Sequence, residues 1–245
     1  MELITGMHRS GTSLVARLFF ESGADLGDAT SFHRPDKWNP DGYFEQPDIH
    51  AINMPLIHGA WGRLAYYRLP STEMILKRAE SCHEQIVTAA EKYDRKIVKE
   101  TRFCLTLPAW LSHGAEVKRI LVCLREPASV VRSLQRRNWI TRGLGYRLWL
   151  DHFRRLIEQA GDIPLWYIRY ENLLEPAAFG REMAAAMRFF DLDQDGQRLE
   201  ALRRETVKPT WNHASRAGTT TPRPVQELWG RLLEQHAAQF GSTGS

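Results

Sequence analysis

The segment at residues 4–14, Ile-Thr-Gly-Met-His-Arg-Ser-Gly-Thr-Ser-Leu, has the composition of a site that binds an anion. Gly6 and Gly11 let the backbone curl so that several N–H groups face one point, and the N-terminus of a following helix adds its positive end there. Arg9 contributes a full positive charge. Further donors are the hydroxyl groups of Ser10, Thr12 and Ser13. The segment therefore predicts a cradle for a phosphate-type group.

The same segment departs from the Walker A loop of nucleotide hydrolases and kinases. Gly6 and Gly11 satisfy the spacing G-x-x-x-x-G, but Thr12 stands where those proteins carry a lysine. That lysine would bind the β- and γ-phosphates, whereas here the cation lies inside the loop, at Arg9. Glycine-rich loops also occur at ordinary strand-to-helix turns. The interpretation therefore needs support from elsewhere in the chain.

A second candidate anion site follows the apolar run at residues 119–124, which is typical of a strand buried on both faces. The run ends at Arg125, and Pro127 suits the first turn of a helix. Ser133 lies eight residues after Arg125, about two turns into that helix. Taken alone, either residue is equally compatible with a solvated surface position. Together with the first loop, they predict a ligand that is phosphorylated at two separate points.

This pairing resembles the sulfotransferase superfamily, which uses 3′-phosphoadenosine 5′-phosphosulfate (PAPS). In that superfamily the first loop holds the 5′-phosphosulfate, and an R-x-P-x5-S element holds the 3′-phosphate. Arg125 through Ser133 fits the second element in full, and residues 7–13 look like the arginine version of the first loop, found in many bacterial enzymes. The resemblance implies that PAPS and its product, 3′,5′-bisphosphoadenosine (PAP), are bound by His8, Arg9, Ser10, Gly11, Thr12, Ser13, Arg125 and Ser133.

Three further stretches extend the resemblance over roughly residues 1–190. Residues 97–102, Ile-Val-Lys-Glu-Thr-Arg, are similar to a bacterial K-D-P-R segment, with Glu-Thr in place of Asp-Pro. Residues 166–173 look like the family's strand that ends in Tyr-Glu-Asp-Leu, whose tyrosine lies beside the adenine, and this implies that role for Tyr170. Residues 39–45, Asn-Pro-Asp-Gly-Tyr-Phe-Glu, are similar to the N-P-x-G-Y-F-E segment of bacterial sulfotransferases.

Sulfuryl transfer, the reaction that the resemblance implies, moves SO3 from the 5′-phosphate of PAPS to a hydroxyl or amine of an acceptor. Negative charge grows on the bridging oxygen as the S–O bond breaks, so fixed cations and N–H donors at that point lower the barrier. Arg9, Lys99 and the first amides of the loop are expected to supply them. This chemistry requires no divalent metal, and no carboxylate pair at ligand spacing demands one, so no metal is expected.

Glu45 is the preferred candidate for the general base that takes the acceptor's proton, a role worth about 10²–10⁴-fold in rate. Its Tyr-Phe-Glu setting resembles the region where glutamate is the base in heparan N-deacetylase/N-sulfotransferases, and the neighbouring aromatic residues are expected to raise its pKa by desolvation. Glu100, beside Lys99 at a strand end, is the second candidate, and His8 is the third. Either glutamate could instead form a structural ion pair with Lys99 or Arg102. Surface or packing roles are expected for His33, His50 and His58.

The predicted strands and helices indicate one α/β domain over residues 1–240, followed by a flexible tail at 241–245. Buried-type strands are predicted near 2–5, 96–99, 119–124 and 165–170. Helices are predicted near 12–22, 74–92, 127–137, 146–160, 176–190 and 225–239. This alternation predicts a single P-loop-like domain with a mainly parallel sheet and helices on both faces. Ligands of such sheets bind at the carboxyl ends of the strands, where Arg9, Lys99, Arg125 and Tyr170 all fall.

The composition of the chain favours some classes of binding partner over others. The 33 Lys and Arg residues against 29 Asp and Glu residues give a net charge of +4, which suits an anionic cosubstrate but is too weak to indicate nucleic acid. No apolar run of membrane length or signal peptide is apparent. The three cysteines, Cys82, Cys104 and Cys123, show no metal spacing, and we expect reduced thiols in the cytoplasm.

The acceptor and two rival functions stay open at this point. A carbohydrate, a phenol or another small molecule would suit the aromatic residues between 31 and 70, among them Trp38, Trp61, Tyr66 and Tyr67, although packing explains most of them equally well. Trp139 is open to both readings. Lys208, His213 and Arg216 are candidates for a C-terminal segment that closes over the 3′-phosphate. The rivals are a kinase with a degenerate P-loop and a non-catalytic nucleotide-binding module; the oligomeric state is not predicted.

Overall fold

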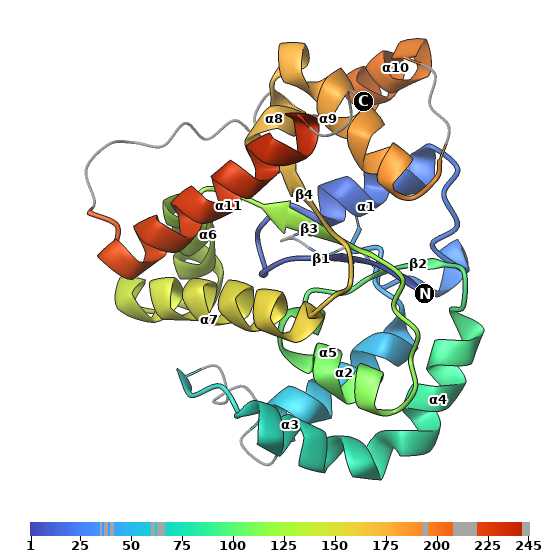
Figure 1. Cartoon of the computed structure of the whole chain (residues 1–245), viewed down its shortest axis with the longest axis vertical. Helices are drawn as coiled ribbons and strands as arrows, with labels where there is room; N and C mark the ends of the chain where they lie inside the picture. Colours follow the sequence, from blue (N-terminus) through green and yellow to red (C-terminus); the bar gives the residue numbers. More distant parts are fainter. Residues whose placement is uncertain are drawn as a thin grey trace.

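The computed structural model describes residues 1–34, 36, 39, 42–59, 62, 67–192, 196–207 and 220–241. Four strands form one parallel sheet in the order β2-β1-β3-β4 (Figure 1). Their bounds are β1 Glu2–Thr5, β2 Ile97–Lys99, β3 Ile120–Leu124 and β4 Leu165–Arg169. In the register Ile4 lies opposite Lys99, and Leu124 lies opposite Arg169. The carboxyl ends of all four strands therefore meet at one edge, as the sequence predicted.

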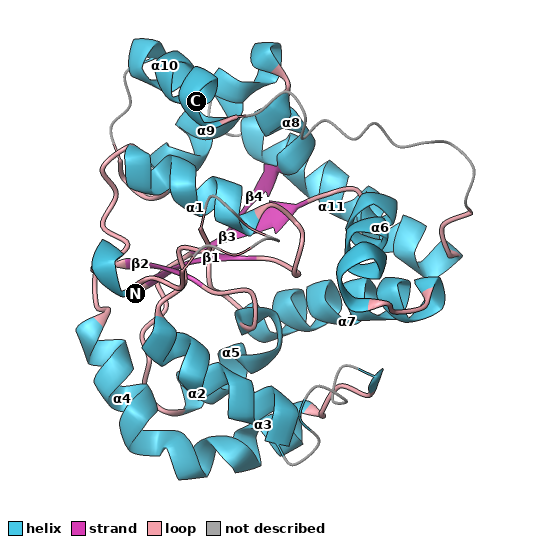
Figure 2. Ribbon diagram, turned by 180° about the vertical axis from the view of Figure 1, so that it is seen from behind, coloured by secondary structure: helices cyan, strands magenta, loops and turns pink. Residues whose placement is uncertain are grey.

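Helices cover both faces of the sheet because successive strand residues are apolar on both sides (Figures 1 and 2). Leu3 and Val122 belong to one core, and Ile4 and Leu121 belong to the other. The second core contains α1 Thr12–Glu21, α8 Tyr170–Leu174, α9 Pro176–Phe189 and α10 Gly196–Thr206. The first core contains α2 Pro47–His58, α3 Thr72–Ala79, α4 His83–Lys92, α5 Phe103–Ser112, α6 Pro127–Asn138, α7 Arg142–Ala160 and α11 Arg223–Gly241.

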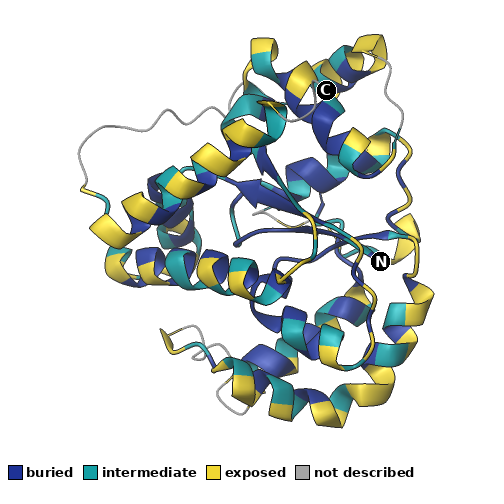
Figure 3. Ribbon diagram, in the orientation of Figure 1, coloured by how far each residue is buried: buried dark blue, intermediate teal, exposed yellow. Residues whose placement is uncertain are grey.

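The strands lie at the buried centre of the molecule, and the exposed residues of the surrounding helices lie on their outer sides (Figure 3). Short 3-10 helices occur at η1 Ala29–Ser31 and η3 Glu80–Cys82, and η3 joins α3 to α4. None of the helices in the described ranges is long and apolar enough to cross a bilayer.

The predicted elements agree with the structure except at four helices. The strands and most helices lie within a few residues of their expected bounds, and the predicted helix at 74–92 is divided into α3, η3 and α4. The sequence did not predict α2, α5, α8 or α10. Pro55 and Pro108 lie inside α2 and α5, and an internal proline normally argues against a helix. Residue 241 is the last of α11, and residues 242–245 of the predicted tail lie outside the described part of the chain.

The edge strand β4 and the turn that follows it are fixed by side chains from α9 and α11. Gln239 pairs with the backbone of Tyr167, accepting from its N–H at 3.0 Å and donating to its C=O at 2.5 Å. Buried Glu182 accepts the N–H of Arg169 at 2.6 Å and lies 2.7 Å from His236 Nε2. These bonds close the outer edge of the sheet and hold the start of α8, which carries Tyr170.

The loop between β1 and α1 lies so close to its neighbours that two glycines are required. A Cβ on Gly6, whose φ is +149°, would lie 2.7 Å from the carbonyl oxygen of Cys123. A Cβ on Gly11, whose φ is +91°, would lie 2.3 Å from Cδ2 of the Tyr170 ring. The glycines therefore let the loop lie directly on β3 and against α8.

Replacing Gly11 by alanine should destabilise the protein more than replacing Gly23, which has the same φ of +91° but open space around its Cβ position. Both substitutions carry the left-handed backbone penalty of about 1–2 kcal/mol. Gly11→Ala must also displace the Tyr170 ring, at an overpacking cost of about 1–3 kcal/mol. Urea unfolding of both variants measures the difference. Equal losses of unfolding free energy would contradict the close approach of the loop to α8.

Candidate active site

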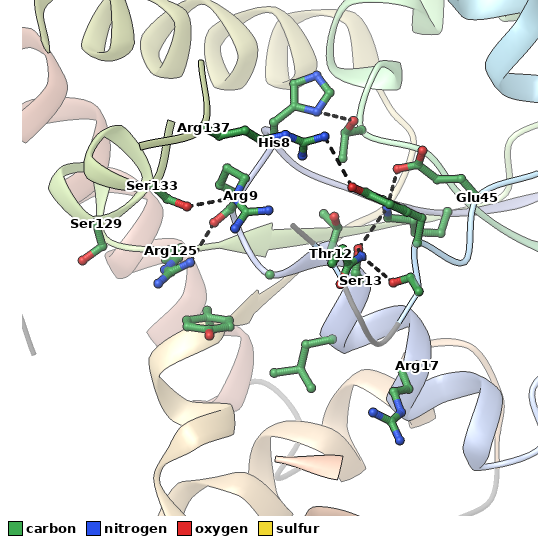
Figure 4. Close-up of a pocket in the computed structure, with 18 of the residues that line it drawn as sticks. His8, Arg9, Thr12, Ser13, Arg17, Glu45, Arg125, Ser129, Ser133 and Arg137 are labelled. Atoms are coloured by element: carbon green, nitrogen blue, oxygen red, sulfur yellow. Dashed lines mark hydrogen bonds and ion pairs between the residues drawn. The ribbon is translucent and has the colours of Figure 1, made fainter. Parts of the chain in front are cut away.

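A cavity of about 340 Å³ opens at the carboxyl edge of the sheet, within the size range of small-ligand sites (Figure 4). Its wall is built from the loop before α1, the ends of β2 and β3, α6, and the segment before α2. Most of the predicted site residues line it, namely His8, Arg9, Gly11, Thr12, Ser13, Glu45, Lys99, Arg125, Ser133 and Tyr170. The structure therefore brings together residues that the sequence places in five separate segments.

Arg9 connects the two predicted anion sites. Its Nε donates to Ser133 Oγ at 2.8 Å, and its carbonyl oxygen accepts from Arg125 Nη1 at 3.0 Å (Figure 4). Its φ of +72° lies in the left-handed region, which is strained for a residue with a side chain. These contacts hold the strained backbone in place. The two anion sites are therefore adjacent parts of one cavity, and Arg9 belongs to both.

Arg125 also packs on the ring of Tyr170. Its guanidinium carbon lies 4.2 Å from the ring centroid, a cation–π contact. Tyr170 is in turn fixed by the close approach of Gly11 and by its position at the start of α8. Arg125 is thus held at a set place on the cavity wall by both a hydrogen bond and an aromatic face. The predicted contact of Tyr170 with adenine stays a prediction.

The cavity is strongly cationic. Among the described residues that line it, Glu45 is the only acid, and the cations are Arg9, Arg17, Lys99, Arg125, Arg132, Arg136 and Arg137. Burial and the charges of Arg137 and Arg125 lower the pKa of Arg9. Like charges held this close repel one another, and an anion bound between them relieves the repulsion. In addition, the N-cap residue of α1 is Gly11, which has no side chain to cap the helix, so the first N–H groups of α1 are available to the same anion.

Lys99 forms a buried ion pair with Glu45. Its Nζ lies 2.5 Å from Glu45 Oε1 and 3.4 Å from Ser13 Oγ, and both charged residues are almost fully buried. Asn39 Nδ2 also donates to Ser13 Oγ, at 3.1 Å. A lysine from β2 therefore reaches the loop that lacks the Walker lysine at position 12. Pro40 and Asp41, which belong to the same predicted motif as Asn39, lie outside the described residues.

The expectation that aromatic neighbours raise the pKa of Glu45 is wrong. Burial does act in that direction, but the charge of Lys99, the proximity of His50, whose Nδ1 lies 3.7 Å from Glu45 Oε2, and the charge of Arg102 outweigh it, and they hold the pKa well below its usual range. The adjacent ring of Phe44 packs elsewhere, against Phe20 and Phe32. The carboxylate is thus surrounded by cations, and the alternative of an ion pair describes its state in this structure.

Two predicted residues lie away from the cavity. Glu100 is fully buried, and its Oε1 accepts from Arg102 Nη1 at 2.6 Å and from the Arg102 N–H at 2.9 Å. Because its carboxylate does not line the cavity, Glu100 is a weaker candidate for the general base than Glu45. Ser10 is also fully buried, its hydroxyl has no hydrogen-bond partner among the described residues, and it does not line the cavity, so only its backbone remains a candidate donor.

His8 lies at the cavity wall as an uncharged side chain. Its Nδ1 is 3.0 Å from the hydroxyl of Thr101, and burial together with the charge of Arg102 lowers its pKa well below the usual value. A neutral imidazole can form a hydrogen bond with a ligand, but it contributes no positive charge to the cavity.

Several residues near the site were not predicted from the sequence to belong to it. Arg17 and Ser129 line the cavity, and His50 lies 3.7 Å from both Glu45 and Glu100, where a surface or packing role had been expected. No local motif marks His50, since it comes from the unpredicted helix α2. The expected closing residues Lys208, His213 and Arg216, and the aromatic residues Trp38, Trp61 and Tyr66, lie outside the described residues. Trp139 and Tyr67 are exposed.

No protein-family model and no curated protein sequence matches the chain. Among solved structures, the chain is similar to a sulfotransferase domain from the curacin biosynthetic pathway, with a TM-score of 0.54 and 13% sequence identity. The similarity covers 95% of this chain and 97% of that one. A likeness at this identity concerns the fold: almost the whole chain is arranged as in that sulfotransferase domain.

Proposed function

We propose that this protein is a sulfotransferase that moves a sulfuryl group from PAPS to a hydroxyl or amine of a small-molecule or glycan acceptor. The observation that carries the proposal is the contact of Arg9 with both Ser133 and Arg125. It joins a phosphate-binding loop to a second cationic site within one cavity, as a doubly phosphorylated adenosine requires. The similarity in fold to a sulfotransferase domain supports the same conclusion.

The positions of the site residues favour one orientation of the proposed donor. The N–H groups at the start of α1 and the hydroxyl groups of Thr12 and Ser13 would hold the 5′-phosphosulfate. Arg125 and Ser133 would hold the 3′-phosphate. The Nε of Arg125 supports this, because it is buried and has no hydrogen-bond partner in the described part of the chain. Arg9, between the two groups, would neutralise charge at both ends.

Lys99 and Arg9 would stabilise the charge that grows on the bridging oxygen as the S–O bond breaks. Glu45 would take the proton from the acceptor as its oxygen or nitrogen bonds to sulfur. As long as Lys99 is paired with Glu45, the carboxylate is a weak base, since the charge of Lys99 lowers its pKa. Drawing Lys99 toward the leaving phosphate would restore that basicity. In this proposal, binding of the donor therefore prepares the base.

Replacing Arg125 with glutamine should weaken PAP binding by about ten- to a hundredfold, because a hydrogen bond to a charged group contributes about 1.5–3 kcal/mol. Arg154 is a matched control: it is exposed on α7 and does not line the cavity, so Arg154→Gln changes the net charge equally. Isothermal titration calorimetry with PAP measures both. Unchanged affinity in Arg125→Gln, or tighter binding of ATP with Mg²⁺ than of PAP by the parent protein, would contradict the proposal and favour the kinase.

Replacing Glu45 with glutamine should not weaken PAP binding, because it removes the carboxylate that competes for Lys99, and it should lower turnover by about 10²–10⁴-fold, because the base is lost. Glu100→Gln is the comparison, because Glu100 is a neighbouring buried carboxylate outside the cavity. Transfer from PAPS to a phenol or sugar acceptor, with folding checked by thermal unfolding, measures both. Turnover within a few-fold of the parent in Glu45→Gln would show that another group is the base.

A further inference from the structure

Behind Glu45, on the side away from Lys99, two histidines and two glutamates converge. One ligand atom each from His33, Glu45 and His50 lie within 4.8 Å of one another. Glu100 joins them, since its Oε2 lies 3.7 Å from His50 Nδ1, the same distance that separates His50 Nδ1 from Glu45 Oε2. The rings of His33 and His50 are also in contact, with centroids 4.5 Å apart.

Each glutamate is paired through Oε1 with a protein cation and has its Oε2 beside His50, although Glu45 Oε2 also lies 3.9 Å from Arg102 Nη1. Glu45 Oε1 is paired with Lys99 at 2.5 Å, and Glu100 Oε1 is paired with Arg102 at 2.6 Å. The two Oε2 atoms both face His50. The cations therefore fix the orientation of both carboxylates, as outer partners do around metal-binding side chains.

Three atoms of the cluster are buried without a hydrogen-bond partner in the described residues. They are His33 Nε2, His50 Nδ1 and Glu100 Oε2, and Glu100 itself is fully buried. Buried polar atoms are almost always paired, and exceptions call for an explanation such as an ion. His50 Nδ1 and Glu100 Oε2 lie 3.7 Å apart, and the His33 ring contacts the His50 ring, so imidazole and carboxylate groups supply the donor types that Zn²⁺ prefers.

We propose that His33, Glu45, His50 and Glu100 form a binding site for a divalent transition metal of the Zn²⁺ type. Tetrahedral Zn²⁺ with bonds of about 2.0–2.2 Å separates its ligands by roughly 3.4 Å. The two 3.7 Å distances at His50 need little adjustment. The ligand atoms of His33, Glu45 and His50 lie within 4.8 Å of one another and would have to draw closer together, and Glu100 would join them from its place beside His50. Imidazole nitrogens favour Zn²⁺ and its neighbours over Mg²⁺ or Ca²⁺.

The charges around the site limit its affinity. Lys99 and Arg102 already balance the two carboxylates, so they repel an added cation. Protons compete as well, because a protonated His50 would pair with both Oε2 atoms, and metal binding requires neutral imidazoles. We therefore expect a dissociation constant on the order of micromolar, well above that of dedicated structural zinc sites.

A metal bound to Glu45 Oε2 would keep this carboxylate from accepting a proton. Zn²⁺ should therefore inhibit sulfuryl transfer reversibly, and a chelator should restore it. This consequence rests on the proposed function, whereas metal binding itself does not. The two can fail separately, because binding is measured without PAPS or acceptor.

The test is titration of the untagged full chain with Co²⁺, followed by visible absorption, and with Zn²⁺, followed by calorimetry. We expect one ion per chain, a tetrahedral Co²⁺ absorption band, and a higher unfolding temperature with Zn²⁺. His50→Ala should lose at least about tenfold in affinity. His83→Ala is the matched control, because His83 is exposed and its ring also contacts another histidine, His113, with centroids 5.1 Å apart.

The proposal is overturned if no absorption band forms, or if the His50→Ala and parent proteins bind Zn²⁺ equally. Should His50→Ala fail to fold, His33→Ala provides the same comparison, since His33 lies in a loop whereas His50 lies within α2. Equal losses in His50→Ala and His83→Ala would place the ion at a surface site and would also overturn it.

Discussion

The structure depends on the convergence of positive charge around the loop that joins β1 to α1. Arg9 is held in a left-handed conformation by two contacts. One is with Ser133, which lies on α6, and the other is with Arg125, which follows the end of β3. Such an arrangement is unfavourable without an anion, because the cations repel one another and the backbone of Arg9 is strained. The fold supports it by packing: Gly6 lies on β3, and Gly11 lies against Tyr170, whose ring in turn supports Arg125.

The ion pair of Lys99 and Glu45 joins anion binding to the chemistry that we propose. Both residues are buried, so the energy of the pair depends strongly on whether another anion is near Lys99. A phosphosulfate at the loop would compete with Glu45 for Lys99. The same carboxylate has its second oxygen beside His50, where a proton or a metal ion can compete in turn. The protonation state of Glu45 therefore depends on Lys99 at one carboxylate oxygen and on the proton or metal ion beside His50 at the other.

Much of this arrangement is readable in the sequence because it follows from local rules. Parallel strands place their ends at one edge, so Arg9, Lys99 and Arg125 could be assigned to one site from their positions after apolar runs. The R-x-P-x5-S spacing placed Ser133 two helical turns from Arg125. The placement of these residues at one sheet edge needed only periodicity and chain direction, whereas their assignment to a 3′-phosphate came from the resemblance to sulfotransferases.

The remaining features depend on packing between segments that are distant in sequence. Whether burial or neighbouring charge sets the pKa of Glu45 depends on how Phe44 and Lys99 are oriented, and no local pattern fixes that. His50 lies on α2, and the sequence did not predict this helix because Pro55 lies inside it. The direct contact of Arg9 with Ser133 also follows from the close approach of α6 to the loop, which the sequence does not specify.

The most direct measurement is a crystal structure of the protein with PAP. We expect the 5′-phosphate at the amides that begin α1, the 3′-phosphate within hydrogen-bond distance of Arg125 and Ser133, and Arg9 between them. A nucleotide bound in the reverse orientation or outside this cavity, or crystals that take up no nucleotide at saturating concentration, would contradict it.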